Sequence, residues 1–535
     1  MSIEQARYIQ LNKWLKSGVF ASWLIDNIED IDKIANATDY AQNNRYDWES
    51  PSIRPWHQLL STLTAGSYPK GIGRYYRTVA TNDRLIVRHN TDATHKLYTI
   101  TTAGVATSID TSSSIASDNR MRFVNVADVV YCMNWSDWFG KLSDTTYSVP
   151  STVPSNFAPS FAVPFDWKLV ASWRPTNPNK IYYSVADNYE DFQSAGTDTG
   201  TTIEQVTGLA STNQAVFYFT TNTISVTDSK DIINTAGTIS YNSSYLQTRE
   251  WSVNHDWIVV VGQKVFYVSP SNTISMIVRG QNVNWFETVS LTDRKGKGIT
   301  EFMNSFPLNQ TNCRAYLQED TNLIHWFFYS QGATFPDKVV VYDHVKDIFV
   351  STDTNRYFYG WVFFKGKNYT ISAIEPKVFR DEYSGDDQGQ SIAREYRTKL
   401  HYLGWGTQDA QIRESRTLLD MNTLANPTQE IRLNWARVDT DTLTSADIPS
   451  VSSWIGTEEI GTYAIGTEWS WWVSPTDYQP VRRLRSKWCF LLNKFNTVQR
   501  RRRNQTVAGK VRLKDVSPFV SWVTPMRTPQ NTSNT

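Results

Sequence analysis

The chain has 535 residues, more than one hydrophobic core usually supports, so we expect roughly two to four domains. Its 53 Lys and Arg balance 52 Asp and Glu to a net charge of +1, which excludes a whole-protein attraction to nucleic acid or to an anionic membrane. Aromatic residues make up 13% of the chain and charged residues only 20%, a balance that favours β structure with polar loops over helical bundles.

The first residues of the chain carry the clearest helical signal. Between residues 2 and 35 the apolar residues recur at a spacing nearer 3.6 than 2, which predicts one or two amphipathic helices. This segment lacks the apolar run of a signal peptide, and no stretch approaches the roughly 20 apolar residues of a membrane helix. We therefore expect an N-terminal helical or extended docking segment over residues 1–71 and a soluble intracellular product with no membrane span.

Residues 72–384 repeat one rhythm of a short strand, a turn rich in Asp, Asn, Gly or Pro, a second strand and a polar stretch. The segments that show it are DRLIVRHNTDATHKLYTI (83–100), MRFVNVADVVYCMN (121–134), WKLVASWRPTNPNKIYYSV (167–185), AVFYFTTNTISVT (215–227), DWIVVVGQKVFYVSPSNTISMIV (256–278), LIHWFFYSQGATFPDKVVVYDHVKDIFVST (323–352) and YFYGWVFFKGKNYTISAI (357–374). Their spacing centres near about 40 to 50 residues, the size of one four-stranded propeller blade. Because each unit has too little apolar surface to stand alone, we predict an all-β propeller of about six or seven blades. A tandem of β-sandwiches is the open alternative.

After an acidic, glycine-containing loop at 382–391 the pattern changes to cleanly alternating strands. These are REYRTKLHYLGWG, EIRLNWARV, VRRLRSKWCFLLNKF and GKVRLKDVSPFVSWV. Such alternation is typical of an antiparallel sheet with one wet face, so residues 385–525 are predicted to form a C-terminal β-sandwich. The polar end, residues 526–535, is expected to be a disordered tail.

No catalytic or metal-binding motif stands out in the sequence. The three cysteines are far apart, and none of the seven histidines has metal-ligand spacing. A nucleophile elbow, a P-loop and a dinucleotide-binding fingerprint are all absent. Neighbouring carboxylates, such as Glu190 with Asp191 and Asp386 with Asp387, fit turn chemistry better than a glycosidase acid and base. We therefore expect a protein that is not an enzyme and that has no catalytic residues, metal site or cofactor.

One cluster of basic residues stands out in a chain whose charges otherwise nearly cancel. It consists of Arg482, Arg483, Arg485, Lys487, Arg500, Arg501, Arg502 and Arg503. If the residues from Phe490 to Phe495 and those after them form a hairpin, the two clusters approach one another. The resulting patch would bind phosphates without reading sequence, or would dock on an acidic protein neighbour. A solvated loop is the alternative interpretation.

The stretch SWRPTNPNKIYYSVADNYEDF (172–192) resembles a motif shared by tail proteins of short-tailed, double-stranded DNA bacteriophages, the tail nozzle or head-to-tail DNA-stabilisation family. The order of the later segments, ending with EYRTKLHYLG (395–404), is similar to that of the family as well. The resemblance implies a structural protein of the virion tail, assembled in the host cytoplasm as a hexameric ring below the portal and adaptor. Such a ring would contact other tail proteins, surround the packaged DNA without reading its sequence, and retain it until ejection. Asp187, Glu190 and Asp191 would then be turn residues at a blade corner.

Two other functions stay open at this point. A receptor-recognition propeller of a phage tail could bind carbohydrate through stacking aromatics, for which Trp469, Trp471 and Trp472 are the candidates. A cellular propeller scaffold with no phage connection fits the composition equally well.

Overall fold

The computed structural model describes residues 6–8, 38–46, 51–382 apart from short interruptions of at most five residues, 392–398, 401–402, 410–421, 428–433, 436–442, 469–470, 497–506 and 511–522. The chain divides into two compact units. The propeller unit comprises His57–Val345 and Asp353–Asp381. The flanking unit comprises Met1–Trp56, Lys346–Thr352 and Glu382–Thr535.

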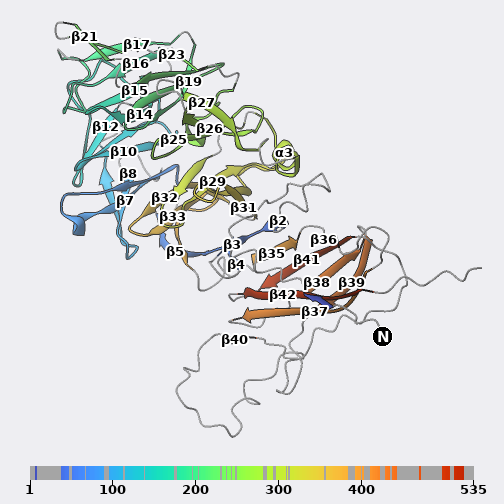
Figure 1. The fold of residues 1–535 in the computed structure, drawn as a ribbon. Coiled ribbons are helices and arrows are strands. Elements are labelled where there is room, and N and C mark those ends of the chain that lie inside the picture. The colour runs from blue at the N-terminus through green and yellow to red at the C-terminus, as the bar shows by residue number, and fades with distance from the viewer. Residues whose placement is uncertain are drawn as a thin grey trace, which may run out of the picture. The chain divides into compact units, whose positions relative to one another are not determined.

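Seven antiparallel four-stranded blades follow one another along the chain (Figure 1). Blade 1 consists of β6 (Gly71–Tyr75), β7 (Arg84–Arg88), β8 (His95–Ile100) and β9 (Ala106–Asp110). Blade 2 consists of β10 (Arg122–Val126), β11 (Val129–Met133), β12 (Gly140–Ser143) and β13 (Thr146–Ser148). Blade 3 consists of β14 (Pro159–Phe165), β15 (Lys168–Trp173), β16 (Lys180–Tyr183) and β17 (Asp198–Thr201).

Blade 4 consists of β18 (Val206–Ser211), β19 (Ala215–Thr220), β20 (Ile224–Asp228) and β23 (Ser244–Tyr245), with the hairpin β21 (Ile232–Thr235) and β22 (Thr238–Tyr241) inserted before its last strand. Blade 5 consists of β24 (Val259–Val261), β25 (Lys264–Val268), β26 (Ile274–Arg279) and β27 (Phe286–Ser290). Blade 6 consists of β28 (Ala315–Gln318), β29 (Leu323–Phe328), β30 (Lys338–Asp343) and β31 (Ile348–Thr354), whose first five residues are counted with the flanking unit. Blade 7 consists of β32 (Phe358–Phe364), β33 (Lys367–Ser372), β34 (Lys377–Glu382) and β5 (Trp56–Thr62).

The blades form a closed ring. The first strand of each blade contacts the first strand of the next, and β6 of blade 1 contacts both β10 and β32, the first strands of blades 2 and 7. The first strands therefore surround a central channel, which is the arrangement of a β-propeller. The prediction of an all-β propeller is confirmed, with seven blades. Strand β5, which precedes the other blade strands in sequence, completes blade 7, so the ring is closed by an early segment of the chain.

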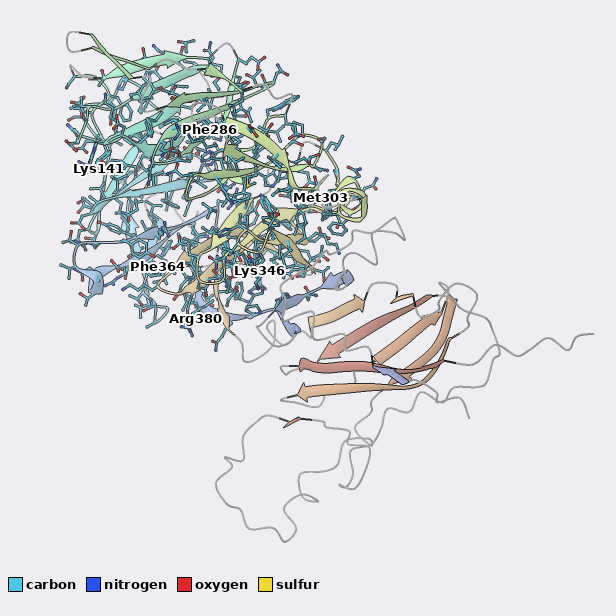
Figure 2. The ribbon with its side chains drawn as sticks, viewed as in Figure 1. Lys141, Phe286, Met303, Lys346, Phe364 and Arg380 are labelled. Carbon is cyan, nitrogen blue, oxygen red and sulfur yellow. The ribbon has the colours of Figure 1, made fainter. Side chains whose placement is uncertain are left out.

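The hydrophobic core lies between blades, not within them. Figure 2 shows the side chains that fill the propeller unit. One cluster joins Ile86 and Leu97 of blade 1 to Val130 and Leu142 of blade 2. Further clusters join blades 2 and 3, blades 3 and 4, blades 4 and 5, and blades 7 and 1. Each blade buries its apolar faces only by stacking on its neighbours, which is why the sequence shows a repeated unit that cannot stand alone.

Little helix is present in the described part of the propeller unit. The helix α3 (Lys297–Asn304) precedes blade 6, and Ile299 and Met303 of this helix are buried. The Asn272 side chain donates hydrogen bonds of 3.3 and 3.0 Å to the carbonyl oxygens of Met303 and Phe306, which ties down the end of the helix. Two single turns of 3-10 helix, η1 (Ala80–Asn82) and η3 (His255–Trp257), are also present. No sequence signal predicted α3.

The flanking unit is also built from antiparallel sheets. One sheet has the order β1 (Ala6–Tyr8), β42 (Val511–Trp522), β37 (Ala410–Met421) and β40 (Trp469–Ser470). A second contains β2 (Thr38–Gln42), β35 (Ile392–Thr398), β41 (Thr497–Thr506), β38 (Thr428–Leu433) and β39 (Ala436–Thr442), with β36 (His401–Tyr402) paired to β41. A short hairpin pairs β3 (Asn44–Tyr46) with β4 (Pro51–Ile53). The all-β character predicted for residues 385–525 is confirmed for the described residues, and the predicted strand VRRLRSKWCFLLNKF (481–495) lies outside them.

The N-terminal helix prediction fails where it can be compared. Residues Ala6–Tyr8 form strand β1, because they pair antiparallel with Phe519–Ser521 of β42. The rest of the predicted helical stretch before residue 38 lies outside the described residues, and so does the predicted disordered tail, 526–535.

Candidate functional site

The motif that carries the family resemblance forms a structural corner of blade 3. Asp187 adopts a left-handed conformation with φ of 60°, and its backbone N–H donates to the carbonyl oxygen of Trp167 at 2.8 Å. The Asp191 carboxylate accepts backbone hydrogen bonds from Gln193 at 3.0 Å and Ser194 at 2.9 Å. Glu190 pairs with Lys141 of blade 2. The interpretation of these carboxylates as turn residues is therefore confirmed.

The predicted basic patch falls only partly on described residues. Arg482, Arg483, Arg485 and Lys487 lie outside them. Arg500, Arg501, Arg502 and Arg503 lie in β41, a strand paired with both β35 and β38. By Cα register Arg503 is opposite Glu395 and Arg501 is opposite Glu430. This run is thus part of a sheet and not of a loop, and its role in DNA or protein binding stays a prediction.

Of the three tryptophans predicted to stack on glycans, the structure describes only the backbone of one. The backbone of Trp469 is in β40, and Trp471 and Trp472 lie outside the described residues.

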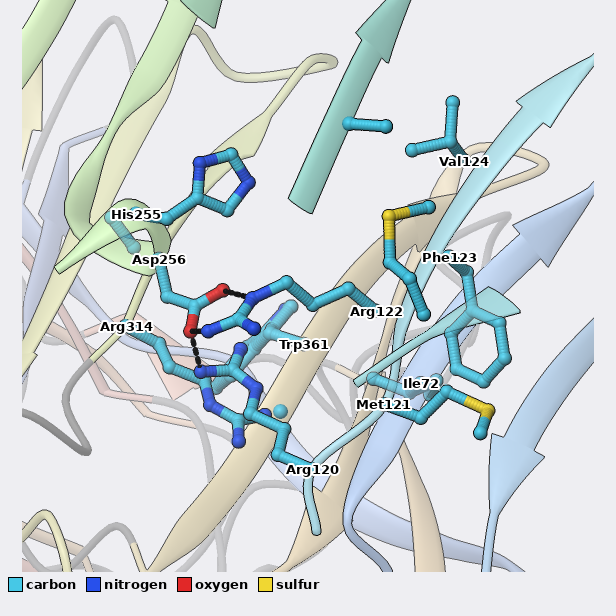
Figure 3. A pocket seen from close by; sticks show the side chains of 14 residues that line it. Ile72, Arg120, Met121, Arg122, Phe123, Val124, His255, Asp256, Arg314 and Trp361 are labelled. Atoms are coloured by element: carbon cyan, nitrogen blue, oxygen red, sulfur yellow. Dashed lines mark hydrogen bonds and ion pairs between the residues drawn. The ribbon is translucent and has the colours of Figure 1, made fainter. Parts of the chain in front are cut away.

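A cavity of about 180 Å³ lies at the centre of the propeller unit (Figure 3). Its charged walls come from residues that precede or begin a blade: Arg120 and Arg122 of blade 2, His255 and Asp256 ahead of blade 5, and Arg314 ahead of blade 6. Apolar residues complete the lining, among them Ile72, Met121, Phe123 and Trp361. Residues that start successive blades reach the same end of the channel because every first strand enters the ring there.

Asp256 is the anionic centre of this cluster. Its carboxylate accepts hydrogen bonds from Arg122 Nε at 2.9 Å and from Arg122 Nη2 at 2.7 Å, a bidentate pair, and it also binds Arg120 Nη1. The Arg122 guanidinium donates through Nη1 to the carbonyl oxygen of Ser160 at 2.9 Å. Burial alone would raise the pKa of Asp256, but the charges of Arg120 and Arg122 outweigh it and hold the pKa well below its ordinary range.

Arg314 is the third arginine of the cluster, and no hydrogen bond joins it to the Asp256 carboxylate among the described residues. Its side chain is 6% exposed, and Nε and Nη2 make no hydrogen bond within the described part of the chain. The Cζ atom lies 4.0 Å from the centroid of the Tyr359 ring, so the guanidinium is partly stabilised by a cation–π contact. Burial, together with the charge of Arg122, lowers the pKa of Arg314 from its ordinary value.

His255 borders the same cavity as a neutral ring. Burial and the two nearby arginines, Arg122 and Arg120, lower its pKa to about 3. Its Nδ1 accepts a hydrogen bond of 3.2 Å from the backbone N–H of Leu209, so the neutral ring carries its proton on Nε2. The ring also stacks on Phe161, with centroids 4.7 Å apart.

This arrangement suits electrostatic binding of an anion. Donors and positive charge converge on the cavity, and Asp256 is the one acid among the described residues that line it. No group of three or more His, Cys, Asp or Glu side chains with the geometry for a metal ion occurs in the described ranges. Cys132, buried in the core between blades 1 and 2, has a pKa raised by burial and is not a reactive thiol.

Sequence reasoning missed this cluster. Arg120, Arg122, Asp256 and Arg314 are scattered over nearly 200 residues, and each alone is typical of a solvated surface charge. A positional signal was available for three of them: Arg120, Arg122 and Asp256 lie within one residue of the start of the predicted segments 121–134 and 256–278, where propeller topology directs the chain to the central channel. Arg314 lies nine residues before the predicted segment 323–352 and had no such signal.

The comparisons with known proteins do not assign this chain to a family. No protein-family model and no curated protein matches the sequence. Among solved structures, the chain is similar to the WD40 repeats of RRP9, with a TM-score of 0.43 and 8% identity over 62% of this chain and 99% of that one. It is also similar to YCF48 from Cyanidioschyzon merolae, with a TM-score of 0.37 and 9% identity over 61% of this chain and 98% of that one.

A third likeness is to PorZ, a surface component of the type-IX secretion system of Porphyromonas gingivalis, with a TM-score of 0.37 and 11% identity over 66% of this chain and 44% of that one. These likenesses are distant, and the seven-bladed architecture rests on the strand pairing of this chain itself.

Within the described residues, no helix has the length and apolar character needed to cross a bilayer.

Proposed function

We propose that this protein is a structural scaffold that works by binding other macromolecules through a rigid propeller, and that it is not an enzyme. The observation that carries the proposal is how its acidic side chains are used. The Asp137 carboxylate binds the backbone N–H groups of Ala116 and Ser117 at 3.0 and 2.9 Å, and the Asp337 carboxylate binds the N–H and hydroxyl of Ser330, both at 2.7 Å. Carboxylates held in this way fix loop geometry, which a scaffold needs in order to present constant surfaces.

A more specific proposal is that the scaffold is a ring component of a bacteriophage tail, which surrounds and retains packaged DNA. The support for it is the motif at 172–192, whose carboxylates occupy the corner positions that the resemblance implies. In a symmetric ring, any basic surface of one chain is repeated by every copy, so a modest patch becomes a large field around a channel.

Negative-stain electron microscopy of the purified full-length chain over a range of concentrations tests the ring. We expect closed rings with an open lumen, because a heterologous interface that closes on itself gives one discrete assembly. Charge reversal of Arg500–Arg503 should weaken DNA retention in such rings. If assembly and retention are both unaffected by the reversal, the DNA role of this run is wrong.

The competing functions give different outcomes in the same experiments. Isolated discs that bind glycans, with binding lost on Trp→Ala changes at Trp469, Trp471 and Trp472, would favour receptor recognition. Isolated discs that bind neither glycans nor copies of the chain would favour a cellular propeller scaffold.

A further inference from the structure

The central cavity has an excess of positive charge; the Arg314 side chain is buried, and those of Arg120 and Arg122 are 18% and 19% exposed. Arg120, Arg122 and Arg314 line it, and Asp256 is the single carboxylate that opposes them among its described lining residues. Arginine does not lose its proton in proteins, so the excess cannot be removed by deprotonation. Keeping an unbalanced charge away from water is costly, and a bound anion removes that cost.

Three buried guanidinium nitrogen atoms of residues that line the cavity are left without a hydrogen-bond partner among the described residues. Arg122 uses its Nε and Nη2 atoms to hold the two oxygens of Asp256. The same two atoms of Arg314 have no partner within the described residues, and neither does Nε of Arg120. These paired N–H groups of a guanidinium match the spacing of two oxygens of a carboxylate or phosphate.

The cavity limits the size of the anion. At about 180 Å³ it holds the volume of roughly six water molecules, and it is smaller than the ~300–1,000 Å³ of sites for drug-sized ligands. Phosphate and short carboxylates match this volume.

We propose that the centre of the propeller is a binding site for a small oxyanion, with phosphate as the reference ligand. Arg314 and Arg120 supply the unpaired donors, and the protonated Nε2 of His255 supplies a neutral donor on the cavity wall. The anion bridges residues ahead of blades 2, 5 and 6 and so stabilises the ring. This site is independent of whether the chain assembles into larger rings.

Thermal unfolding of the full-length protein in sodium phosphate tests the site. Sodium chloride at the same ionic strength is the reference for screening by salt, and Arg314→Met in the same phosphate is the reference for the general stabilisation that excluded phosphate gives to any folded protein. A ligand that binds only the folded state raises Tm in a concentration-dependent way, so we expect Tm to rise by a few degrees in phosphate beyond the chloride reference. Equal Tm in phosphate and chloride at every concentration would overturn the proposal. A parallel titration with acetate separates the two sources: a rise with acetate alone assigns the site to carboxylates, and a rise with phosphate assigns it to phosphate.

Variants locate the binding. Arg314→Met should lower phosphate affinity by about tenfold or more, measured by calorimetry, because a charge-assisted pair of donors is lost. Arg74→Met is the matched control: this exposed arginine also lies over a tyrosine ring, Tyr76, at 5.4 Å, but it is not part of the cavity lining. Unchanged phosphate affinity in a folded Arg314→Met protein would contradict the assignment.

A second variant, Asp256→Asn, should enlarge the effect of phosphate on Tm. Asp256→Asn removes the built-in carboxylate, so the cavity becomes more positive and its need for an external anion grows. We expect Asp256→Asn to have a lower Tm than the wild type in chloride, and to gain a larger increase in Tm from phosphate. A phosphate-induced increase no larger than that of the wild type would count against the site.

Discussion

At the scale of single residues, the buried carboxylates of the propeller act as loop anchors. Asp137 is the clearest case: it accepts hydrogen bonds from Ser117 through both backbone N–H and hydroxyl, from the Ala116 N–H, and from Asn134 Nδ2 at 2.6 Å. Four donors converge on one side chain that is 5% exposed. Loss of that side chain leaves several of these donors unsatisfied in a buried place.

We therefore expect Asp137→Ala to lower the free energy of unfolding by about 2 to 4 kcal/mol, measured by urea denaturation. The control is Glu375→Gln, which removes a half-exposed ion pair with Lys377 and should change the same quantity by less than about 1 kcal/mol. Equal effects of the two substitutions would contradict the anchoring role.

His255 gives the stability a pH dependence. Its folded-state pKa of about 3 is below the ordinary value near 6.5, so between these values the unfolded chain binds a proton that the folded chain does not. Stability is lost as pH falls through this window, by up to about 1.4 kcal/mol per pH unit. The neighbouring Asp256 stays ionised there, because Arg120 and Arg122 hold its pKa well below the window.

His255→Gln should therefore give a shallower decline in the free energy of unfolding between about pH 6 and pH 4. His89 and His344, whose pKa values are also lowered by burial, retain their contributions in both proteins. Denaturant unfolding at several pH values measures the two slopes, and identical slopes would show that His255 titrates normally in the folded chain.

At the scale of elements, the inner strands of neighbouring blades approach so closely that some positions exclude a side chain. A Cβ atom at Gly71 of β6 would lie 2.4 Å from the carbonyl oxygen of Met121, just before β10. Backbone cannot yield to such a contact without moving one blade against the next.

Gly71→Ala should cost about 1 to 3 kcal/mol or more of unfolding free energy. Gly200→Ala is the matched control, since a Cβ atom there meets nothing closer than 3.7 Å and the position lies in the outer strand β17. Chemical denaturation compares them. A Gly71 variant as stable as the Gly200 variant would mean that blades 1 and 2 are not this tightly packed.

The closure of the propeller ring by strand β5 can also be tested at this scale. Strand β5 completes blade 7, so removal of residues 1–63 should expose the edge of β34 and cause aggregation or early melting. Removal of residues 1–37 keeps β5 and serves as the control. Scattering and circular dichroism during heating distinguish the two truncations, and equal melting curves would refute closure by β5.

Much of the fold could be predicted from sequence, and most of the candidate site could not. Strand–turn–strand segments such as 121–134 and 357–374 carry local signals, because alternation and turn residues act over a few positions. Helix α3 gave no signal, since eight residues with two buried apolar groups are too short for a clear period. Strand β1 pairs with residues some 500 positions away, and such a partner overrides local helical spacing.

The site was hidden for a related reason. The closeness of Arg122, Asp256 and Arg314 arises from the closing of the ring and not from any local spacing. Conversely, the run Arg500–Arg503 looked important because it is contiguous, yet it belongs to a paired strand. Contiguity of charge in sequence and convergence of charge in space are separate properties.

At the scale of the whole molecule, the proposed function requires that a propeller whose loops are fixed by carboxylates assembles with copies of itself. Mass photometry of the purified full-length protein, from nanomolar to micromolar concentration, tests this claim most directly. We expect a step from one chain to a single discrete multiple, because closed symmetric assemblies have one size. A protein that stays at the mass of one chain throughout, or that grows in an open-ended series, would contradict self-assembly into a ring.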